Sequence, residues 1–138
     1  SSSQSQNRIY DSIRYPNDLH TLLALHASFR RSLLTLWLHT HDTSSLRASS
    51  LLRSLLTDGV GETHGGVGYV EVQLDAPTIE DLGVVFRINE IPTLMAFSRG
   101  EAQFGSRVET SGKGGLGDRA FLSGWVEREA ARRGEGGG

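Results

Sequence analysis

Apolar and polar positions follow two different periods along the chain, and the periods predict alternating strands and helices. Residues 33–38 are apolar at every position except Thr35, which is typical of a strand covered on both faces. Residues 67–74 instead place Val70, Val72 and Leu74 at every second position, as a strand with one buried face does. The remaining predicted strands are residues 8–14, 93–97 and 102–108.

Between these strands, apolar residues recur at the three- and four-residue spacing of helices packed on a sheet. The predicted helices are residues 16–29, 46–58, 77–86 and 118–133. Leu46, Leu51, Leu52, Leu55 and Leu56 are predicted to share the buried face of the second helix. The buried face of the third helix is predicted to be Ile79, Leu82, Val85 and Phe86. The order β-α-β-α-β-α-β-β-α predicts an α/β fold with a central mixed sheet of about five strands and helices on both faces.

Length and composition narrow the classes of function. A chain of 138 residues predicts one domain, here residues 8–133, between a disordered segment at 1–7 and a flexible glycine-rich tail at 134–138. A net charge of −2 gives no electrostatic footprint for nucleic acid, and no apolar run is long enough for a membrane span. Because Ser1 opens the sequence, we expect an excised or processed chain. We expect an intracellular location, mitochondrial if a targeting segment has been removed.

One segment resembles the second half of a thioredoxin domain. A strand ending at Asp75 is followed by a helix, by the turn Ile91-Pro92-Thr93, and by a strand that closes on Gly100. The resemblance extends over residues 8–133 and implies the thioredoxin-like fold. It also implies a cis peptide bond before Pro92 and a groove that can pair with an extended peptide.

The same resemblance indicates that the family's chemistry has been lost. Sliding its pattern along the chain places Asp42 and Ser45 at the two positions of the Cys-x-x-Cys motif, and the chain contains no cysteine. His41 stands for the tryptophan before the motif, and Leu36 stands for the buried aspartate of the proton relay. Glu71 takes the position of that aspartate's lysine partner. A carboxylate can cap a helix but cannot attack a disulfide, so thiol–disulfide exchange is excluded for these residues.

The sequence therefore predicts a redox-inactive domain that binds protein, in a chaperone-like or scaffolding role, without a cofactor or metal. The predicted groove, which would be polar and acidic, consists of His41, Asp42, Thr43, Glu90, Ile91, Pro92 and Gly114. Its expected partner is a basic or polar extended peptide segment.

Two alternatives stay open at this point. The chain could be a cysteine-independent enzyme that uses Ser45 on a small ligand such as glutathione, or a metal held by His39, His41 and Asp42 with help from His64. It could also be a structural domain of a larger protein. The glycine-rich stretch 111–118 lacks the spacing of a phosphate-binding loop, and one of its glycines is expected to line the groove.

Overall fold

The chain folds around a mixed β-sheet, as its hydrophobic pattern predicts. The computed structural model describes residues 6–28, 31–109 and 115–132. In these residues the strands are β1 (Arg8–Ile9), β2 (Leu33–Leu38), β3 (Gly68–Gln73), β4 (Thr93–Ser98) and β5 (Glu101–Glu109). The helices are α1 (Pro16–Ala27), α2 (Thr43–Thr57), α3 (Leu82–Val85) and α4 (Arg119–Ala131), with 3-10 turns η2 (Glu62–His64) and η3 (Pro77–Ile79). None of the described helices is long and apolar enough to cross a membrane.

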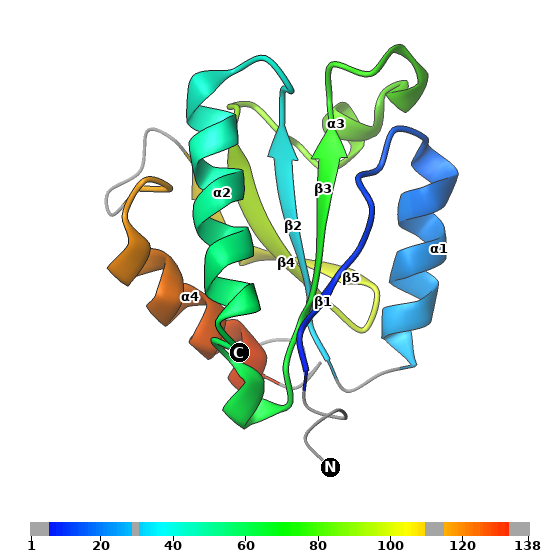
Figure 1. Cartoon of the computed structure of the whole chain (residues 1–138). Coiled ribbons are helices and arrows are strands. Elements are labelled where there is room, and N and C mark those ends of the chain that lie inside the picture. The colour runs from blue at the N-terminus through cyan, green and yellow to red at the C-terminus, as the bar shows by residue number, and fades with distance from the viewer. Residues whose placement is uncertain (1–5, 29–30, 110–114, 133–138) are drawn as a thin grey trace.

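The sheet has the spatial order β1-β3-β2-β4-β5. Strands β1, β3 and β2 run parallel, whereas β4 and β5 are antiparallel to their neighbours. Helices α2 and α4 cover one face, and α1 and α3 cover the other (Figure 1). This three-layer arrangement confirms the predicted α/β fold class.

Strand β2 lies at the centre because its side chains feed both hydrophobic cores. Leu34, Leu36 and Leu38 pack against α2 and α4, while Leu33 and Trp37 pack against α1 and η3. All six residues of the strand are buried. The one polar member, Thr35, donates a hydrogen bond to the Met95 carbonyl (2.8 Å) and accepts one from Trp37 Nε1 (2.7 Å), so its burial leaves no unpaired hydroxyl.

The third predicted helix, residues 77–86, is not continuous. The chain forms η3, then adopts a left-handed backbone at Glu80 (φ 59°), and forms only the single turn α3 before Phe86. Val85, predicted to point inward, is 57% exposed, whereas Phe86 packs on Trp37 and Phe97 with ring centroids 5.5 and 5.3 Å apart. The inward position of Phe86 is thus confirmed, and that of Val85 is wrong.

Leu46 is a second correction to the predicted faces. The sequence predicts it on the buried face of α2, but it is 53% exposed, while Ala48 and Ser45 in the same turns are fully buried. The apolar stripe that packs on the sheet therefore runs through Ala48, Leu52, Leu55 and Leu56. Leu46 is displaced from this stripe by the helical rotation of 100° per residue.

Asn7 belongs to the folded domain, although the sequence placed it in a disordered segment. Its side-chain amide donates to the carbonyls of Leu56 (3.1 Å) and Val60 (2.9 Å), and its Oδ1 accepts from the Val67 amide (2.9 Å). Its own backbone N–H donates to Glu62 (2.8 Å). One side chain thus joins the end of α2 to the start of β3, and the predicted boundary is wrong at this residue.

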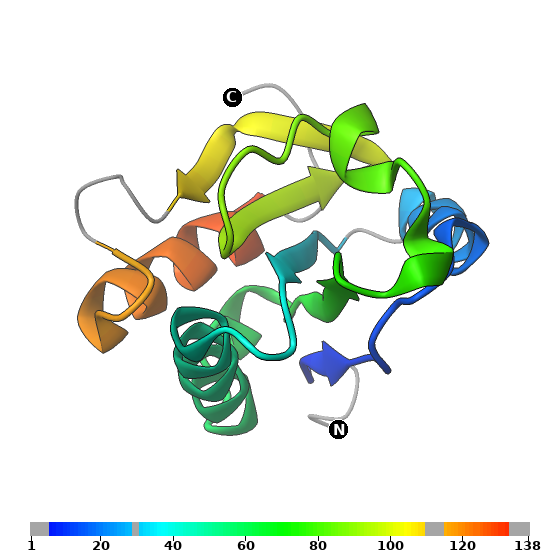
Figure 2. The same ribbon diagram turned by 90° about the horizontal axis from the view of Figure 1, so that it is seen from above.

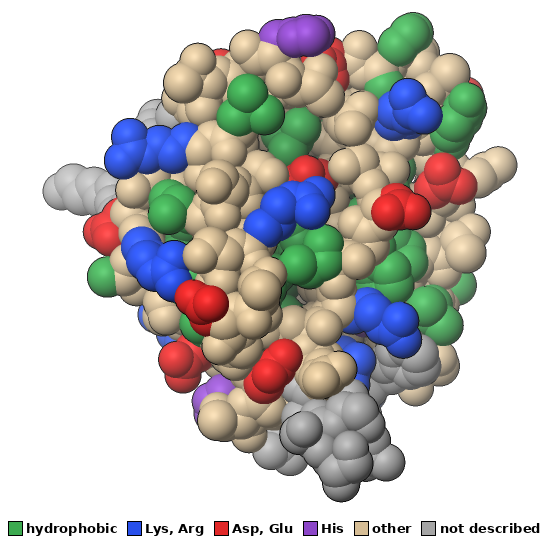
Figure 3. Space-filling view, viewed as in Figure 1, with side chains coloured by type: hydrophobic (Ala, Val, Ile, Leu, Met, Phe, Trp, Pro, Cys, Tyr) green, Lys and Arg blue, Asp and Glu red, His purple; other side chains and the backbone are tan. Residues whose placement is uncertain are grey.

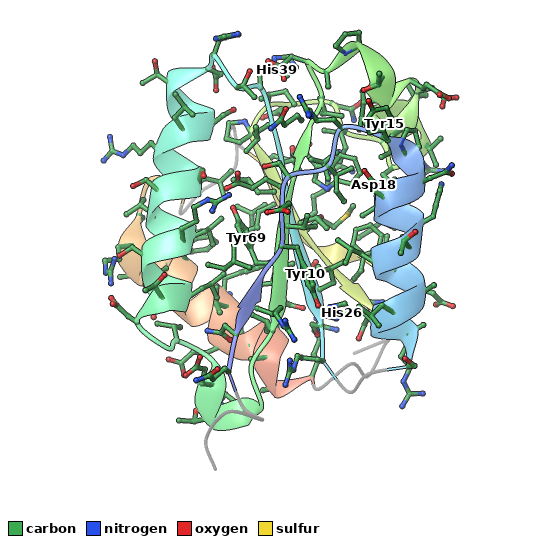
Figure 4. All side chains as sticks on the ribbon, turned by 45° about the vertical axis from the view of Figure 1, so that its right-hand side comes forward. Tyr10, Tyr15, Asp18, His26, His39 and Tyr69 are labelled. Atoms are coloured by element: carbon green, nitrogen blue, oxygen red, sulfur yellow. The ribbon has the colours of Figure 1, made fainter. Side chains whose placement is uncertain are left out.

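His26 joins helix α1 to the edge of the sheet (Figure 4). Its ring is buried, with Nδ1 3.2 Å from the Arg31 carbonyl and Nε2 3.0 Å from the Tyr10 hydroxyl. Because a carbonyl can only accept, Nδ1 carries the proton and the Tyr10 hydroxyl donates to Nε2. Burial lowers the pKa of His26, although its hydrogen bond to the Arg31 carbonyl acts in the opposite direction.

Replacing Asn7 should destabilise the domain. The Asn7→Ala variant loses three side-chain hydrogen bonds and leaves partly buried backbone groups unpaired, so we expect a loss of about 2–3 kcal/mol in the free energy of unfolding. Urea denaturation measures this change. The neighbouring Gln6→Ala is the control, because Gln6 is exposed, and it should change stability by less than about 0.5 kcal/mol. Equal stability of the two variants would show that the Asn7 contacts contribute nothing.

Lowering the pH should destabilise the domain through His26. The unfolded chain, in which histidine has a pKa of 6.5, binds the proton more readily than the fold does, so stability falls as the pH drops through about 6.5. The free energy of unfolding of the wild type should therefore decline more steeply than that of His26→Gln between about pH 7.5 and pH 5.5. His20→Gln, at an exposed position on the same helix, should follow the wild type. Parallel curves for wild type and His26→Gln would contradict the assignment.

Candidate functional site

The two positions assigned to the missing cysteines lie together at the start of α2. Asp42 is the N-cap of this helix, and its Oδ2 accepts hydrogen bonds from the backbone N–H of Ser45 (2.8 Å) and from its hydroxyl (2.9 Å). Ser45 is fully buried, and its Oγ also accepts from the His39 amide (3.3 Å). Sequence reasoning predicted Asp42 as a helix cap, and this geometry confirms it. The pair fixes where the loop after β2 becomes helix.

Pro92 reaches the same end of the sheet from the other side. The Ile91–Pro92 peptide bond is cis, and Pro92 is buried directly before β4. Thr93, the first residue of β4, is the register partner of Trp37 in β2 and donates a side-chain hydrogen bond to the Glu90 carbonyl (2.7 Å). This antiparallel pairing brings the turn before β4 to the carboxyl end of β2. Figure 2 looks onto this end, with the start of α2, the turn before β4 and the segment before α4 around it.

A pocket of about 250 Å³ opens between these segments. It is lined by Ser44, Arg47, Pro92, Gly115, Leu116 and Gly117. Among the predicted groove residues that the structure describes, Pro92 is the one that lines this pocket. Ser44 and Arg47 come from the first turns of α2, and Leu116 is a buried residue of the segment before α4. The lining thus combines an apolar floor with one hydroxyl and one guanidinium.

The other predicted groove residues are placed differently. Asp42 is half-buried and occupied in capping α2, while His41, Thr43, Glu90 and Ile91 do not line this pocket. Gly114 lies outside the described residues, next to the lining residue Gly115. The prediction of an acidic groove therefore differs from the pocket that forms, in which Arg47 is the only charged lining residue within the described part of the chain.

His41 lines a second, polar pocket of about 400 Å³ at the carboxyl ends of β2 and β3. The other side chains with polar groups around it are Arg14, Tyr15, Thr40, Gln73, Asp75 and Thr78. Asp75 Oδ2 accepts from the Thr40 backbone N–H (2.9 Å) and hydroxyl (2.6 Å), which ties the loops after β2 and β3 together. Burial raises the pKa of Asp75, but the hydrogen bonds from Thr40 outweigh it, so the pKa is lowered.

The metal site proposed as an alternative, with His39, His41 and Asp42 as ligands, does not form in the described residues. Among residues 6–28, 31–109 and 115–132, no three histidine or acidic side chains come together in a group that could hold a metal ion. The Ser45 hydroxyl, the candidate nucleophile, is buried and donates its hydrogen bond to a capping carboxylate. A nucleophile also needs access to a substrate, and the buried Ser45 hydroxyl has none.

The position of the family's proton relay carries a structural ion pair. Leu36 and Glu71 are register partners on β2 and β3, as the alignment predicts. The Glu71 carboxylate accepts from Arg53 Nη2 (3.0 Å) and Nε (3.1 Å), from the Tyr69 hydroxyl (2.8 Å) and from Ser49. Burial raises the pKa of Glu71, but these donors outweigh it and hold the pKa below the usual range. The carboxylate is satisfied within the fold and fastens α2 to the sheet.

The sequence matches no protein-family model and no curated protein. Solved structures do match. They include thioredoxin from Fasciola hepatica, which is 15% identical, with 88% of this chain and 98% of that chain covered and a TM-score of 0.66. A thioredoxin pre-protein from Schistosoma mansoni is 17% identical (89% and 99% covered, TM-score 0.68), and thioredoxin NaTrxh from Nicotiana alata is 13% identical (94% and 98%, TM-score 0.68). These likenesses establish a thioredoxin-like fold. Unlike a protein that uses Cys-x-x-Cys, residues 1–138 contain no cysteine.

Restoring cysteines at positions 42 and 45 should restore a disulfide. The Ser45 hydroxyl donates to the Asp42 carboxylate (2.9 Å), so the two side chains face each other at the three-residue spacing of a Cys-x-x-Cys motif. We expect Asp42→Cys/Ser45→Cys to lose both free thiols in oxidised glutathione. Losing the cap should cost about 1 kcal/mol in stability. Titration of free thiols on the folded protein measures the outcome.

The control is Asp42→Cys/Ser44→Cys, because Ser44 is exposed and its side chain makes no hydrogen bond to Asp42 among the described contacts. This pair should keep two free thiols or form mixed disulfides with glutathione. If the 42/45 pair also stays free in the folded protein, these two positions do not have the geometry of the family's motif.

Proposed function

We propose that this chain is a redox-inactive thioredoxin-like domain that binds an extended segment of a partner protein at the pocket between α2 and Pro92. The role is that of a chaperone-like or scaffolding module. The observation that carries the proposal is the pocket itself, which lies between the first turns of α2, the cis-proline turn and the glycine-containing segment before α4.

The backbone beside the pocket supports recognition of an extended chain. Neither the N–H nor the carbonyl of Ile91 forms a hydrogen bond with another described residue, although Ile91 is half-buried. The hydrogen-bonded pairing with β2 starts two residues later, at Thr93, the first residue of β4. An extended peptide that aligns with Ile91 would use both groups, in the manner of a strand added to a sheet edge. Main-chain pairing of this kind provides affinity, and the adjacent pocket provides specificity for one side chain.

The absence of cysteine favours binding over catalysis. Thiol–disulfide exchange needs a thiolate, and the residues at the corresponding positions are the capping Asp42 and the buried Ser45. Both side chains stabilise the start of α2, which keeps the pocket walls in place. The proposal therefore assigns to this pocket the recognition of extended segments that the resemblance implies, without the reacting groups.

Filling the pocket should abolish binding of extended peptides. Ser44 lines the pocket and is exposed, so Ser44→Arg places a long side chain across it without disturbing the core. We expect peptides selected from a randomised synthetic library on the wild-type domain to bind Ser44→Arg at least about tenfold more weakly. Fluorescence anisotropy with individual labelled peptides measures the dissociation constants.

Ser50→Arg is the matched control, because it makes the same change at an exposed position of the same helix outside the pocket. It should leave the selected affinities unchanged, and chemical denaturation should show that both variants are folded. In addition, the amide resonance of Ile91 should shift when a selected peptide binds. Peptides that bind wild type and Ser44→Arg equally well would place recognition elsewhere and refute the proposal.

A further inference from the structure

Arg47 determines the sign of the charge in the proposed binding pocket. Among the described residues, the remaining lining consists of Ser44, Pro92, Leu116 and two glycines, none of which carries a charge. The guanidinium also has a defined position, because it lies over the segment before α4. A Cβ atom built on Gly117 would stand 3.4 Å from Arg47 Nε and 3.7 Å from Cζ. The side chain thus spans from α2 to Gly117 along one wall of the pocket.

This guanidinium has no anionic partner among the described residues. The same helix offers a contrast, since Arg53 pairs with Glu71 at 3.0 Å. Elsewhere Arg119 pairs with Asp58 (2.8 Å) and Arg132 with Glu129 (2.9 Å). Arg47 takes part in none of the four ion pairs of the described residues, which also include Arg107 with Glu109. Its five N–H donors are therefore open to a ligand, and they suit a carboxylate in a bidentate geometry.

The two acidic residues that flank the pocket residues in sequence, Asp42 and Asp118, both cap helices. The Asp42 carboxylate caps α2 through Ser45, and the Asp118 carboxylate caps α4 through the Ala120 amide (3.0 Å). Each cap directs its carboxylate toward backbone N–H groups of its own helix. A positive pocket consequently forms beside two capping aspartates, of which Asp42 belongs to the predicted acidic groove.

We infer that the partner segment carries an aspartate or glutamate that pairs with Arg47, next to a small apolar side chain seated on Pro92 and Leu116. This inference rests on the proposed function and adds the chemistry of the partner. In an extended chain, side chains i and i+2 point to the same side and lie about 6.6–7 Å apart. An acidic residue and an apolar residue two positions apart could therefore contact Arg47 on one wall and Pro92 and Leu116 on the apolar floor. The pocket volume of about 250 Å³ has room for one such apolar side chain.

The test compares three peptide libraries that are identical except for one fixed position, which is Glu, Gln or Lys. Each is measured by equilibrium binding against wild type, Arg47→Gln, Arg47→Glu and Ser44→Arg. We expect wild type to bind the Glu library at least about fivefold more tightly than the Lys library, with a preference that weakens as salt is raised. Arg47→Gln should remove the preference, and Arg47→Glu should reverse it.

Arg128→Glu is the charge-matched control, because Arg128 is exposed on α4 and does not line the pocket. It should keep the preference for Glu, which separates a local contact from an effect of net charge. Binding that is sensitive to Ser44→Arg but shows no preference for Glu, or a preference that survives Arg47→Glu, overturns the inference and leaves the proposed function standing. If none of the libraries binds in a way that Ser44→Arg weakens, both the inference and the proposed function fail.

Discussion

The pairing of β2 with β3 on one side and β4 on the other is the constraint on which the rest of the molecule depends. It buries all six residues of β2 and divides them between two cores, so the strand cannot slide by one residue without exchanging leucines and Trp37 between the faces. The fixed register then places everything at the carboxyl end of the strand. The loop to Asp42 starts from Leu38, and the turn at Pro92 stands beside it because Thr93 pairs with Trp37.

Because the core fixes this geometry, the pocket does not depend on redox chemistry. The residues at the former cysteine positions now contribute to stability, with Asp42 capping α2 and Ser45 buried against it. Within the sheet, the residues at the positions of the proton relay also have structural roles. Leu36 joins the apolar core, and Glu71, at the neighbouring register position, is held by Arg53 and Tyr69. The resemblance implies polar groups for proton transfer at these two positions, and this chain has an apolar side chain at one and a carboxylate held by its hydrogen-bond donors at the other.

The sequence predicts the sheet well because burial on two faces leaves an unambiguous signal, as in residues 33–38. It predicts helix faces less well. Leu46 and Val85 are apolar residues that the fold leaves exposed, since a short helix and a helix start do not pack along their whole length. Asn7 was missed because a single asparagine in a Ser/Gln-rich segment has no periodic signal. Its importance comes from carbonyls about fifty residues away along the chain.

The charge of the candidate site could not be predicted from residue types alone. Counting charges near the motif gives an acidic groove, because His41, Asp42 and Glu90 are adjacent in the family's pattern. Arg47 lines the pocket, whereas Asp42 is occupied as the N-cap of α2, since a carboxylate next to a helix start is stabilised by accepting from its free N–H groups. Surface charges on the face drawn in Figure 3 are otherwise interspersed, with arginines and acidic residues side by side. The charge that a partner meets is thus decided less by the composition of the chain than by which charged groups the helix caps and ion pairs have already occupied.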